Sequence, residues 1–527
     1  MQLKPVIACV SLLAGTLVAV SGTSAQAAAV RYEAERSPAV CSGAIESEWG
    51  GYSDTGFCNA GNAVGAHAQF TVNAAAAGTA TVQVRFANGT TTARPANVTV
   101  SGSAAGSASF QGTGTWATWA TKTLTVPVRA GSNTIQLSPT TATGLPNIDY
   151  VDVEVQAGGG TTPPPAGTTL YVAPNGTDSA AGTEAAPTTL ASALARVPSG
   201  GQIYLRGGKY ALARTVTIAP DNSGTASAPK QLSTYPGETP VLNFAAMTED
   251  PANRGLAVNG SYWNIEGLVV EHAGDNGIFV GGSNNTIERT VTRFNRDTGL
   301  QLSRMASTTP RDQWPSDNLV LSAQSHDNAD SDGEDADGFA AKLTVGSGNV
   351  FRYAVAHNNI DDGWDLYTKT DTGPIGAVTI EDSLAYENGT LSDGSQNSSG
   401  DRNGYKLGGE DIKVNHVVRR NIAYDNGKHG FTYNRNLGTM AVSDNISIDN
   451  SERNFSFDGG TSVFRNNVSC RSGSGTNDKT VGDADGTNQF WSGTNGSRCS
   501  SYAGALAWTY TPDGRLAVTF GGNRVTP

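Results

Sequence analysis

The sequence is poor in charged residues, in histidine and in long apolar runs, and each shortage excludes a class of protein. Only 16% of the 527 residues are charged, which leaves little material for amphipathic helices. Histidine occurs six times and no cysteine pair has C-x-x-C spacing, so a zinc site is not expected. The formal net charge of −12 argues against nucleic acid as a partner, and no apolar run reaches the ~20 residues of a membrane span.

The N-terminus has the pattern of a secretory signal peptide. Lys4 precedes an apolar run from Pro5 to Val20, and the small-residue motif A-x-A follows at residues 25–27. We therefore expect residues 1–27 to be removed and the mature protein to be secreted and extracellular.

Cysteine is also scarce, and its placement predicts two disulfide bonds. Of the five cysteines, Cys9 lies in the predicted signal peptide. The other four form two local pairs, Cys41 with Cys58 and Cys470 with Cys499. An even number in an exported chain favours structural bridges over a redox or metal role.

Glycine is abundant, with 64 residues, and it indicates many tight turns and an all-β fold class. One glycine-rich segment, residues 158–168, contains mainly Gly, Thr and Pro and has no large apolar side chain to pack. Such a composition predicts a linker. The chain therefore divides into a module at residues 28–157 and a domain at residues 169–527.

The first module alternates apolar and polar residues in short segments. Examples are residues 79–86, 96–101, 122–128 and 133–137, which are separated by turn residues. This pattern predicts a β-sandwich of the jelly-roll kind.

The ends and loops of this module resemble carbohydrate-binding module family 35 and its relative, family 6. The resemblance rests on Tyr-Glu-Ala-Glu at residues 32–35, Arg-Phe-Ala-Asn-Gly at 85–89, Trp-Ala-Thr-Trp at 116–119 and Asn-Ile-Asp-Tyr-Val-Asp-Val at 147–153. It implies that Glu33, Glu35 and Asp152 hold a structural calcium ion, because carboxylate oxygens suit calcium. It also implies that the candidate sugar-binding residues are Tyr52, Trp116 and Asn147.

The second domain contains a repeat built on a recurring glycine. The glycines are Gly277, Gly299, Gly338, Gly363, Gly404 and Gly430. A large apolar residue follows each of them, and the third position after each glycine is also apolar, which is the signature of a strand with one buried face. An asparagine column precedes the glycines at residues 295, 328, 359, 388, 426 and 450, and the unperturbed spacing is 22 residues.

Repeats of this length indicate a solenoid, and we predict a right-handed parallel β-helix. A stacked asparagine in each turn can satisfy backbone groups of the neighbouring coils. The alternative, a Greek-key sandwich, does not predict aligned glycine and asparagine columns.

The alignment also predicts which side chains meet, because equivalent positions on successive coils lie about 4.8 Å apart. Asp337 and Asp362 both precede the glycine and should be neighbours, with Asp361 and Asp365 beside them. Lys406 occupies the same outward position as Asp365, one coil later. Carboxylates this close need a cation between them, and calcium takes oxygen ligands readily.

These segments resemble polysaccharide lyase family 9. The resemblance is carried by Asp-Gly-Phe-Ala-Ala-Lys at residues 337–342, Asn-Asn-Ile-Asp-Asp-Gly-Trp-Asp at 358–365 and Gly-Tyr-Lys-Leu-Gly-Gly at 404–409. It implies a pectate lyase on a parallel β-helix in which Asp337, Asp361, Asp362 and Asp365 bind the catalytic calcium and Lys406 is the base. The expected reaction is β-elimination in a (1→4)-linked galacturonan, with a rate that rises toward alkaline pH as Lys406 loses its proton.

Further basic residues could hold the uronates of the polymer. Arg402, Lys428 and Arg435 lie on the same coil as Lys406 or on the next one, and ordinary surface charge is the alternative interpretation. The expected partner is an acidic polysaccharide bound by a monomer.

Three alternatives remain open at this point. A hydrolase on the same scaffold would use paired carboxylates and need neither calcium nor Lys406. A non-catalytic β-helix would only bind plant cell wall. Within the lyase hypothesis, rhamnogalacturonan or another uronide could replace pectate as the substrate.

Overall fold

The computed structural model describes residues 29–74, 78–128, 131–157, 169–511 and 513–525. The predicted signal peptide and linker lie outside these residues. The chain divides into two compact units, Met1–Pro163 and Pro164–Pro527, and each has its own hydrophobic core. Among the described residues, no helix combines the length and apolar composition of a membrane span.

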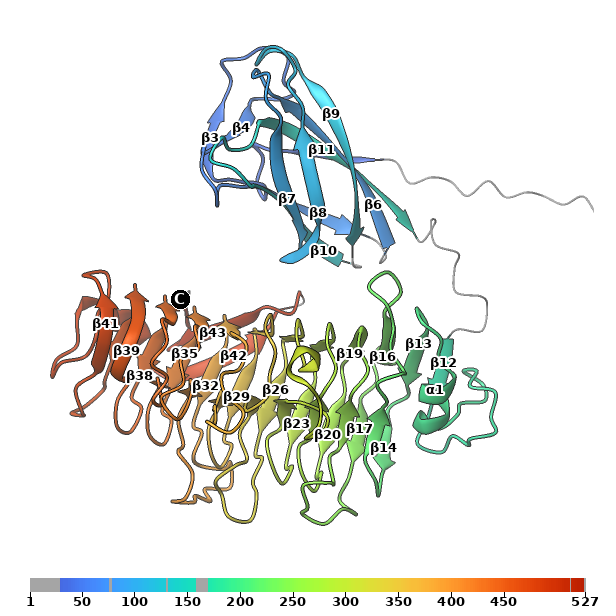
Figure 1. Cartoon of the computed structure of the whole chain (residues 1–527), viewed down its shortest axis with the longest axis vertical. Helices are drawn as coiled ribbons and strands as arrows, with labels where there is room; N and C mark the ends of the chain where they lie inside the picture. The colour runs from blue at the N-terminus through green and yellow to red at the C-terminus, as the bar shows by residue number, and fades with distance from the viewer. Residues whose placement is uncertain (1–28, 75–77, 129–130, 158–168, 512, 526–527) are drawn as a thin grey trace, which may run out of the picture. The chain divides into compact units, whose positions relative to one another are not determined.

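The N-terminal unit is a sandwich of two antiparallel sheets, as the alternation predicts (Figure 1). Its inward side chains, such as Phe70, Val72, Val82 and Val84, are fully or almost fully buried. One sheet contains β1 (Val30–Glu33), β3 (Gly43–Glu46), β4 (Phe57–Ala60), β6 (Gly78–Ala87), β9 (Ala120–Val128) and β11 (Asn147–Ala157). The other contains β2 (Val40–Cys41), β5 (Ala68–Ala74), β7 (Arg94–Val100), β8 (Ser103–Phe110) and β10 (Gly131–Pro139).

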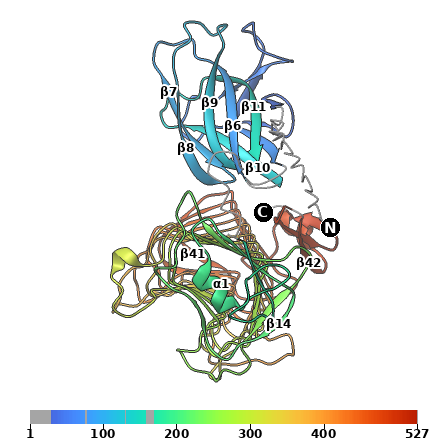
Figure 2. The same cartoon turned by 90° about the vertical axis from the view of Figure 1, so that its right-hand side faces the viewer.

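The C-terminal unit is a parallel β-helix, which confirms the predicted solenoid. In Figure 2 its coils project onto one another around a common axis. One long sheet contains β12 (Thr169–Val172), β13 (Gln202–Leu205), β15 (Val216–Ile218), β16 (Lys230–Thr234), β18 (Leu256–Val258), β19 (Trp263–Glu266), β21 (Ile278–Val280), β22 (Thr286–Glu288), β24 (Leu300–Leu302), β25 (Leu319–Leu321), β27 (Phe339–Ala341), β28 (Val350–Arg352), β30 (Trp364–Asp365), β31 (Thr379–Glu381), β33 (Tyr405–Lys406), β34 (Val417–Arg419), β36 (Phe431–Thr432), β37 (Ala441–Ser443), β39 (Phe455–Arg465) and β41 (Lys479–Ala484).

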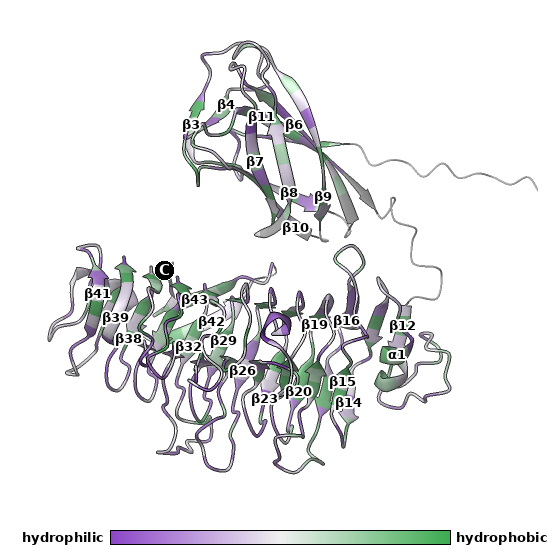
Figure 3. Ribbon diagram, in the orientation of Figure 1, coloured by the Kyte–Doolittle hydropathy of each residue, from purple (hydrophilic) through white to green (hydrophobic). Residues whose placement is uncertain are grey.

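A second parallel sheet completes each coil, and its strands follow one another in chain order along the solenoid (Figure 1). It contains β14 (Gly208–Ala211), β17 (Pro240–Asn243), β20 (Val269–Glu271), β23 (Val291–Arg293), β26 (Gln324–His326), β29 (Val355–His357), β32 (Leu384–Tyr386), β35 (Ile422–Tyr424), β38 (Ile446–Ile448) and β40 (Val468–Cys470). Figure 3 shows hydrophobic segments on strands of this unit and hydrophilic colours along many of its turns.

The recurring glycine is required by the close approach of neighbouring coils. A Cβ atom on Gly363 would lie 2.6 Å from the carbonyl oxygen of Gly404 and 2.9 Å from Nδ2 of Asn388. The large residue after each glycine points into the core, where Trp364, Tyr405 and Phe431 stack with centroid distances of 4.8 and 4.6 Å. The recurring glycines thus allow neighbouring coils to approach closely, and the large apolar residues that follow them fill the interior of the solenoid.

The predicted asparagine column forms a continuous ladder of buried side chains. Each Nδ2 donates to Oδ1 of the next asparagine at 2.8–2.9 Å, from Asn295 through Asn328, Asn359, Asn388 and Asn426 to Asn450. The structure adds two asparagine ladders that the sequence alignment missed. Their members are Asn285, Asn318 and Asn349, and Asn421, Asn445, Asn467 and Asn488.

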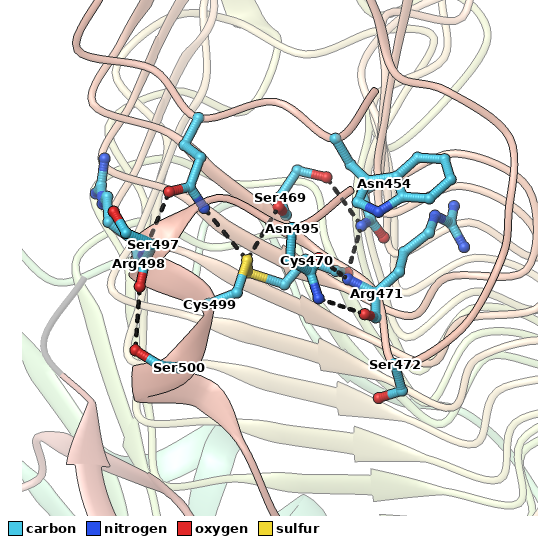
Figure 4. Close-up of a disulfide and its surroundings, with 12 residues drawn as sticks. Asn454, Ser469, Cys470, Arg471, Ser472, Asn495, Ser497, Arg498, Cys499 and Ser500 are labelled. Atoms are coloured by element: carbon cyan, nitrogen blue, oxygen red, sulfur yellow. Dashed lines mark hydrogen bonds between the residues drawn. A yellow bond between two sulfur atoms is a disulfide. The ribbon is translucent and has the colours of Figure 1, made fainter. Parts of the chain in front are cut away.

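The two ends of the solenoid are covered by different elements. Helix α1 (Leu190–Arg196) lies across the N-terminal end and buries Leu190, Ala193 and Leu194 (Figure 2). At the other end the disulfide between Cys470 and Cys499 joins β40 to the 3₁₀ helix η2 (Ser497–Tyr502), as Figure 4 shows. A second 3₁₀ helix, η1, spans Arg311–Gln313.

A small C-terminal sheet packs on the outside of the solenoid and was not predicted. It contains β42 (Leu506–Tyr510), β43 (Leu516–Phe520) and β44 (Asn523–Val525). The Tyr510 hydroxyl donates to the Ala323 carbonyl at 3.0 Å, and Phe520 packs against Tyr424. The second predicted disulfide, between Cys41 and Cys58, is also present.

Candidate active site

Strands β30 and β33 place an aspartate beside a lysine. Asp365 pairs directly with Lys406 in the parallel register, so both side chains leave the same face of the sheet. Lys406 Nζ lies 3.5 Å from Asp365 Oδ2 and 3.3 Å from Asp362 Oδ2. Asp365 is only 4% exposed and Lys406 only 8%, so their charges interact with little screening by water. The structure thus brings together the residues that the coil alignment placed side by side.

Asp337 and Asp362 complete an acidic cluster in the turns before their glycines. The Asp362 amide donates to Asp337 Oδ1 at 3.3 Å, and both side chains are fully buried. Ligand oxygens of Asp337, Asp362 and Asp365 lie within 4.8 Å of one another, which is the spacing of a site for a metal ion. We call these three residues the aspartate cluster.

Asp361 lies beside the aspartate cluster but is not one of its three members. Its Oδ1 accepts hydrogen bonds from the backbone amides of Asp401 and Arg402, the latter at 3.1 Å. Asp361 therefore holds the loop that precedes Lys406.

Burial makes the ionised form of these carboxyl groups costly. It raises the pKa of Asp337 and Asp361 well above the usual range, and it raises the pKa of Asp362 to about 7. Asp362 Oδ2 is buried and accepts no hydrogen bond, and Lys406 Nζ lies 3.3 Å away from it. A cation that accepts oxygen ligands would remove both penalties, so these residues fit a bound divalent ion.

Two buried lysines flank the aspartate cluster. Burial disfavours the charged form of Lys406, but the carboxylates of Asp365 and Asp362 outweigh this effect and raise its pKa well above the usual range. On the opposite side, Lys342 Nζ lies 2.8 Å from Asp337 Oδ2 and 3.6 Å from Asp365 Oδ2. The cluster therefore has positive charge on both sides.

Two family models match the chain. Residues 170–467 match the Pel9A-like right-handed β-helix region, and residues 41–155 match carbohydrate binding module family 6. The chain belongs to the Pel9A-like β-helix family. It is a polysaccharide lyase with an N-terminal carbohydrate-binding module.

Similar proteins support this assignment for the C-terminal unit of the lyase. Pectate lyase L of Paenibacillus polymyxa (strain SC2) is 54% identical over 325 residues, which cover 61% of this chain and 72% of that protein. The crystal structure of pectate lyase Pel9A is 32% identical in sequence and has a TM-score of 0.56. The match covers 66% of this chain and 86% of the Pel9A chain. A rhamnogalacturonan lyase has 22% identity and a TM-score of 0.55, with coverage of 67% and 96%, and shows the shared fold alone.

Sequence reasoning missed two residues of the lyase site. Lys342 was visible in the motif but had no assigned role, because its reach to Asp337 depends on the path of the chain after β27. Asp401 lies in the loop of residues 389–402, and its carboxylate contacts Lys406 at 3.2 Å and Lys428 at 3.0 Å. No repeat pattern in the sequence marks this loop, so its contacts could be found only in the structure.

The two arginines predicted to bind substrate have different surroundings. Arg402 packs its aliphatic part close to Gly389 and Gly427, and its Nε is buried without a partner. Arg435 is exposed and forms an ion pair with Asp411. It lines a polar pocket beside the aspartate cluster, whereas Arg402 is not among the residues that line this pocket.

The predicted calcium group of the binding module needs one correction. Asp152 forms a two-bond ion pair with Arg31, at 2.8 Å for each bond, so its carboxylate is already paired. Asp149 takes that place, since the Ser53 hydroxyl bridges Glu33 at 2.7 Å and Asp149 at 3.2 Å. Asp149 lies in an irregular stretch of β11, between Ile148 and Val151, where the regular alternation of side chains is interrupted.

Of the other carboxylates of this group, Asp149 is fully buried and Glu33 and Glu35 are half-buried. Burial raises the pKa of Asp149 to about 6. Glu35 accepts from the Thr55 amide at 3.0 Å, and its Oε2 is buried without a partner. Among the described residues, the carboxylates whose oxygens are close enough to share a metal ion are those of the aspartate cluster, so a structural calcium ion in this module stays a prediction.

The three predicted sugar contacts of the module do not share one environment. Asn147 is only 3% exposed, and Tyr52 packs against Phe57 with a centroid distance of 5.7 Å. Trp116 is half-buried under Gly89, where a Cβ atom would come within 2.5 Å of its ring. Tyr52 and Trp116 are both half-buried, so their rings are more accessible than the buried Asn147.

Proposed function

We propose that the chain is a secreted, calcium-dependent pectate lyase that cleaves (1→4)-linked galacturonan by β-elimination. The observation that supports this proposal is the position of Lys406, whose amine lies 3.3 and 3.5 Å from Asp362 and Asp365 at the edge of a buried aspartate cluster. A buried amine beside a cluster of carboxylates differs from the pair of catalytic carboxyl groups that a hydrolase needs.

The aspartate cluster is the proposed calcium site, with Asp361 as a further neighbour. When bound, calcium neutralises the substrate carboxylate next to C5 and makes the C5 proton easier to remove. The uncharged amine of Lys406 accepts this proton. The electron pair of the broken C5–H bond forms the C4–C5 double bond, and the C4–O bond breaks, so that the leaving sugar oxygen is protonated from water.

The state of Lys406 sets the pH dependence of this reaction. Only the neutral amine can accept a proton, so the rate should rise as the pH rises toward the pKa of Lys406. The carboxylates around Lys406 raise that pKa, and a divalent ion bound among them opposes their effect.

Export and substrate class belong to the same proposal. The A-x-A motif at residues 25–27 and the two disulfides are what an exported enzyme would have. The partner is an acidic polysaccharide, pectate or polygalacturonate, bound by a monomer whose N-terminal module attaches to plant polysaccharide.

The experiment compares the wild-type protein with Lys406→Ala on polygalacturonate in the presence of calcium. Unsaturated product ends are followed by their ultraviolet absorbance. Removing the base should lower kcat by about 10²- to 10⁴-fold, while the exposed Lys209→Ala variant keeps the wild-type rate.

The same assay separates the rival functions. Undiminished turnover by Lys406→Ala, or products with saturated ends, would favour a hydrolase. A wild-type protein that binds pectate without cutting it would be a binding protein. A parallel assay on rhamnogalacturonan identifies the preferred uronide.

A further inference from the structure

A polar pocket of about 200 Å³ continues the active site on the C-terminal side of Lys406. Thr432 and Ser456 line this pocket, and the strand register places them in line with Lys406: Lys406 pairs with Thr432, and Thr432 pairs with Ser456. Thr432 and Ser456 are 6% and 3% exposed, so their side chains are held in place by the surrounding coils. Successive coils are about 4.8 Å apart, so the pocket begins one coil beyond the proposed base.

The lining of this pocket combines a cation with sugar-like hydrogen-bonding partners. Lys428 is 31% exposed and contributes the amine, and Asn403 and Asn434 contribute amides. The Asn434 amide nitrogen Nδ2 donates to the Gly408 carbonyl at 2.7 Å, which leaves its Oδ1 as an acceptor. The ring of Tyr433 adds an apolar surface of the kind that packs against a sugar face.

An internal carboxylate pairs with Lys428, one of the two cations that line the pocket; the other, Arg435, pairs with Asp411. Lys428 Nζ lies 3.0 Å from Asp401 Oδ1, while Asp401 Oδ2 lies 3.2 Å from Lys406 Nζ. Asp401 is 40% exposed, so water can hydrate it when it gives up one of these contacts. A carboxylate from outside can therefore replace Asp401 at Lys428.

We propose that this pocket binds one uronic acid residue of the substrate, adjacent to the sugar that Lys406 deprotonates. The sugar carboxylate pairs with Lys428, and the sugar hydroxyls bond to Thr432, Ser456 and Asn434. This assignment rests on the proposed function, because it takes Lys406 as the point of cleavage. Lys428 is here a specificity-determining residue that selects an acidic neighbour on this side of the cut.

The test measures binding without turnover. The full chain carrying Lys406→Ala is titrated with trigalacturonate in the presence of calcium, by calorimetry, with and without Lys428→Ala. Loss of one charge-assisted contact should weaken binding by about 10- to 100-fold. Lys428→Arg should recover most of the affinity, and Thr432→Val should lose a few-fold.

Two controls fix the interpretation. Lys413→Ala removes an exposed lysine that does not line the pocket and should leave the affinity unchanged. The methyl ester of trigalacturonate lacks the charge that Lys428 recognises, so Lys428→Ala should not alter its binding further. Calcium affinity should be equal in all variants, because Lys428 contacts no member of the aspartate cluster.

The outcomes for the pocket and for the enzyme are separable. Equal affinity of Lys428→Ala and its parent for trigalacturonate, with lyase activity intact in the wild type, would overturn the pocket assignment alone. A charge-dependent loss at Lys428 in a protein that cannot cleave pectate would leave the pocket as a uronate site and remove the proposed function. A circular dichroism spectrum equal to the parent shows that each variant is folded.

Discussion

Burial has opposite consequences for the acids and the histidines of the β-helix. It raises the pKa of Asp362 to about 7, and it lowers the pKa of His416 to about 3 and that of His357 to about 4. His416 is fully buried, and its Nδ1 accepts a hydrogen bond from the Val378 amide at 3.1 Å. The imidazole of His416 is therefore neutral in the folded protein over the pH range in which a free histidine takes up a proton.

This difference predicts a loss of stability on the acid side. Below about pH 6.5 the unfolded chain protonates His416 and the folded chain does not, so the free energy of unfolding falls by about 1.4 kcal/mol per pH unit until the folded pKa is reached. Above pH 6.5 the residue contributes no pH dependence. His416→Asn should reduce the drop in melting temperature between pH 7.5 and pH 5, measured by calorimetry.

The matched control is His67→Asn in the N-terminal unit, which should leave the drop unchanged. An equal acid sensitivity in His416→Asn and the wild type would mean that His416 is protonated without cost in the folded state.

Residue positions in the active site were predictable where the repeat fixes them. Asp365 and Lys406 share one outward column, so the strand register alone places them side by side. Asp401 reaches Lys406 from an irregular loop, and Asp149 approaches Glu33 from an irregular stretch of β11. Such contacts depend on the path of the backbone, which side-chain patterns do not encode.

At the level of the secondary-structure elements, ladders of buried amides connect the coils. Each asparagine of the first ladder bonds to the next coil on one side and receives a bond from the previous coil on the other. Asn388, for example, accepts from Asn359 and donates to Asn426, with both distances at 2.9 Å. Removing one member leaves donors and acceptors unpaired on two neighbouring coils.

We predict that Asn388→Ala lowers the free energy of unfolding by about 2–4 kcal/mol, because several buried polar groups lose their partners. Denaturant unfolding monitored by circular dichroism measures this change. The exposed Asn477→Ala should change the stability by less than about 0.5 kcal/mol. Equal stabilities of the two variants would show that the ladder contributes little.

The elements themselves were predictable to different extents. The coils between residues 269 and 455 follow from glycine and asparagine columns, since each coil must repeat the contacts of the last. The sheet of β42, β43 and β44 has no such column, and it docks through contacts distant in the sequence, such as the Ser322 hydroxyl bonding to the Gly514 carbonyl. Nothing local in residues 506–525 specifies that surface.

On the scale of the whole molecule, the two units have separate cores and separate chemical groups. The aspartate cluster, Lys406 and the pocket beyond it all belong to the unit that starts at Pro164. The aromatic and acidic groups of the binding module belong to the other unit. Catalysis and attachment to solid substrate should therefore be separable.

A chain that begins at Pro164 should keep kcat/KM on soluble polygalacturonate within about two-fold, because its core and site are complete. The same chain should adsorb less to insoluble plant cell wall, since it lacks the module. Sedimentation with the insoluble material and rates on the soluble polymer check the two parts. A large loss of the soluble rate would show that the module contributes to catalysis.

The most direct test of the account is a calcium titration of the metal-free protein with polygalacturonate, in which the rate of formation of unsaturated ends is read. The aspartate cluster predicts no rate in excess chelator, a saturable recovery as calcium is added, and a shift to higher calcium in Asp362→Asn, which loses one buried charge. A full rate in excess chelator, or an Asp362→Asn variant with the wild-type calcium curve, would contradict it.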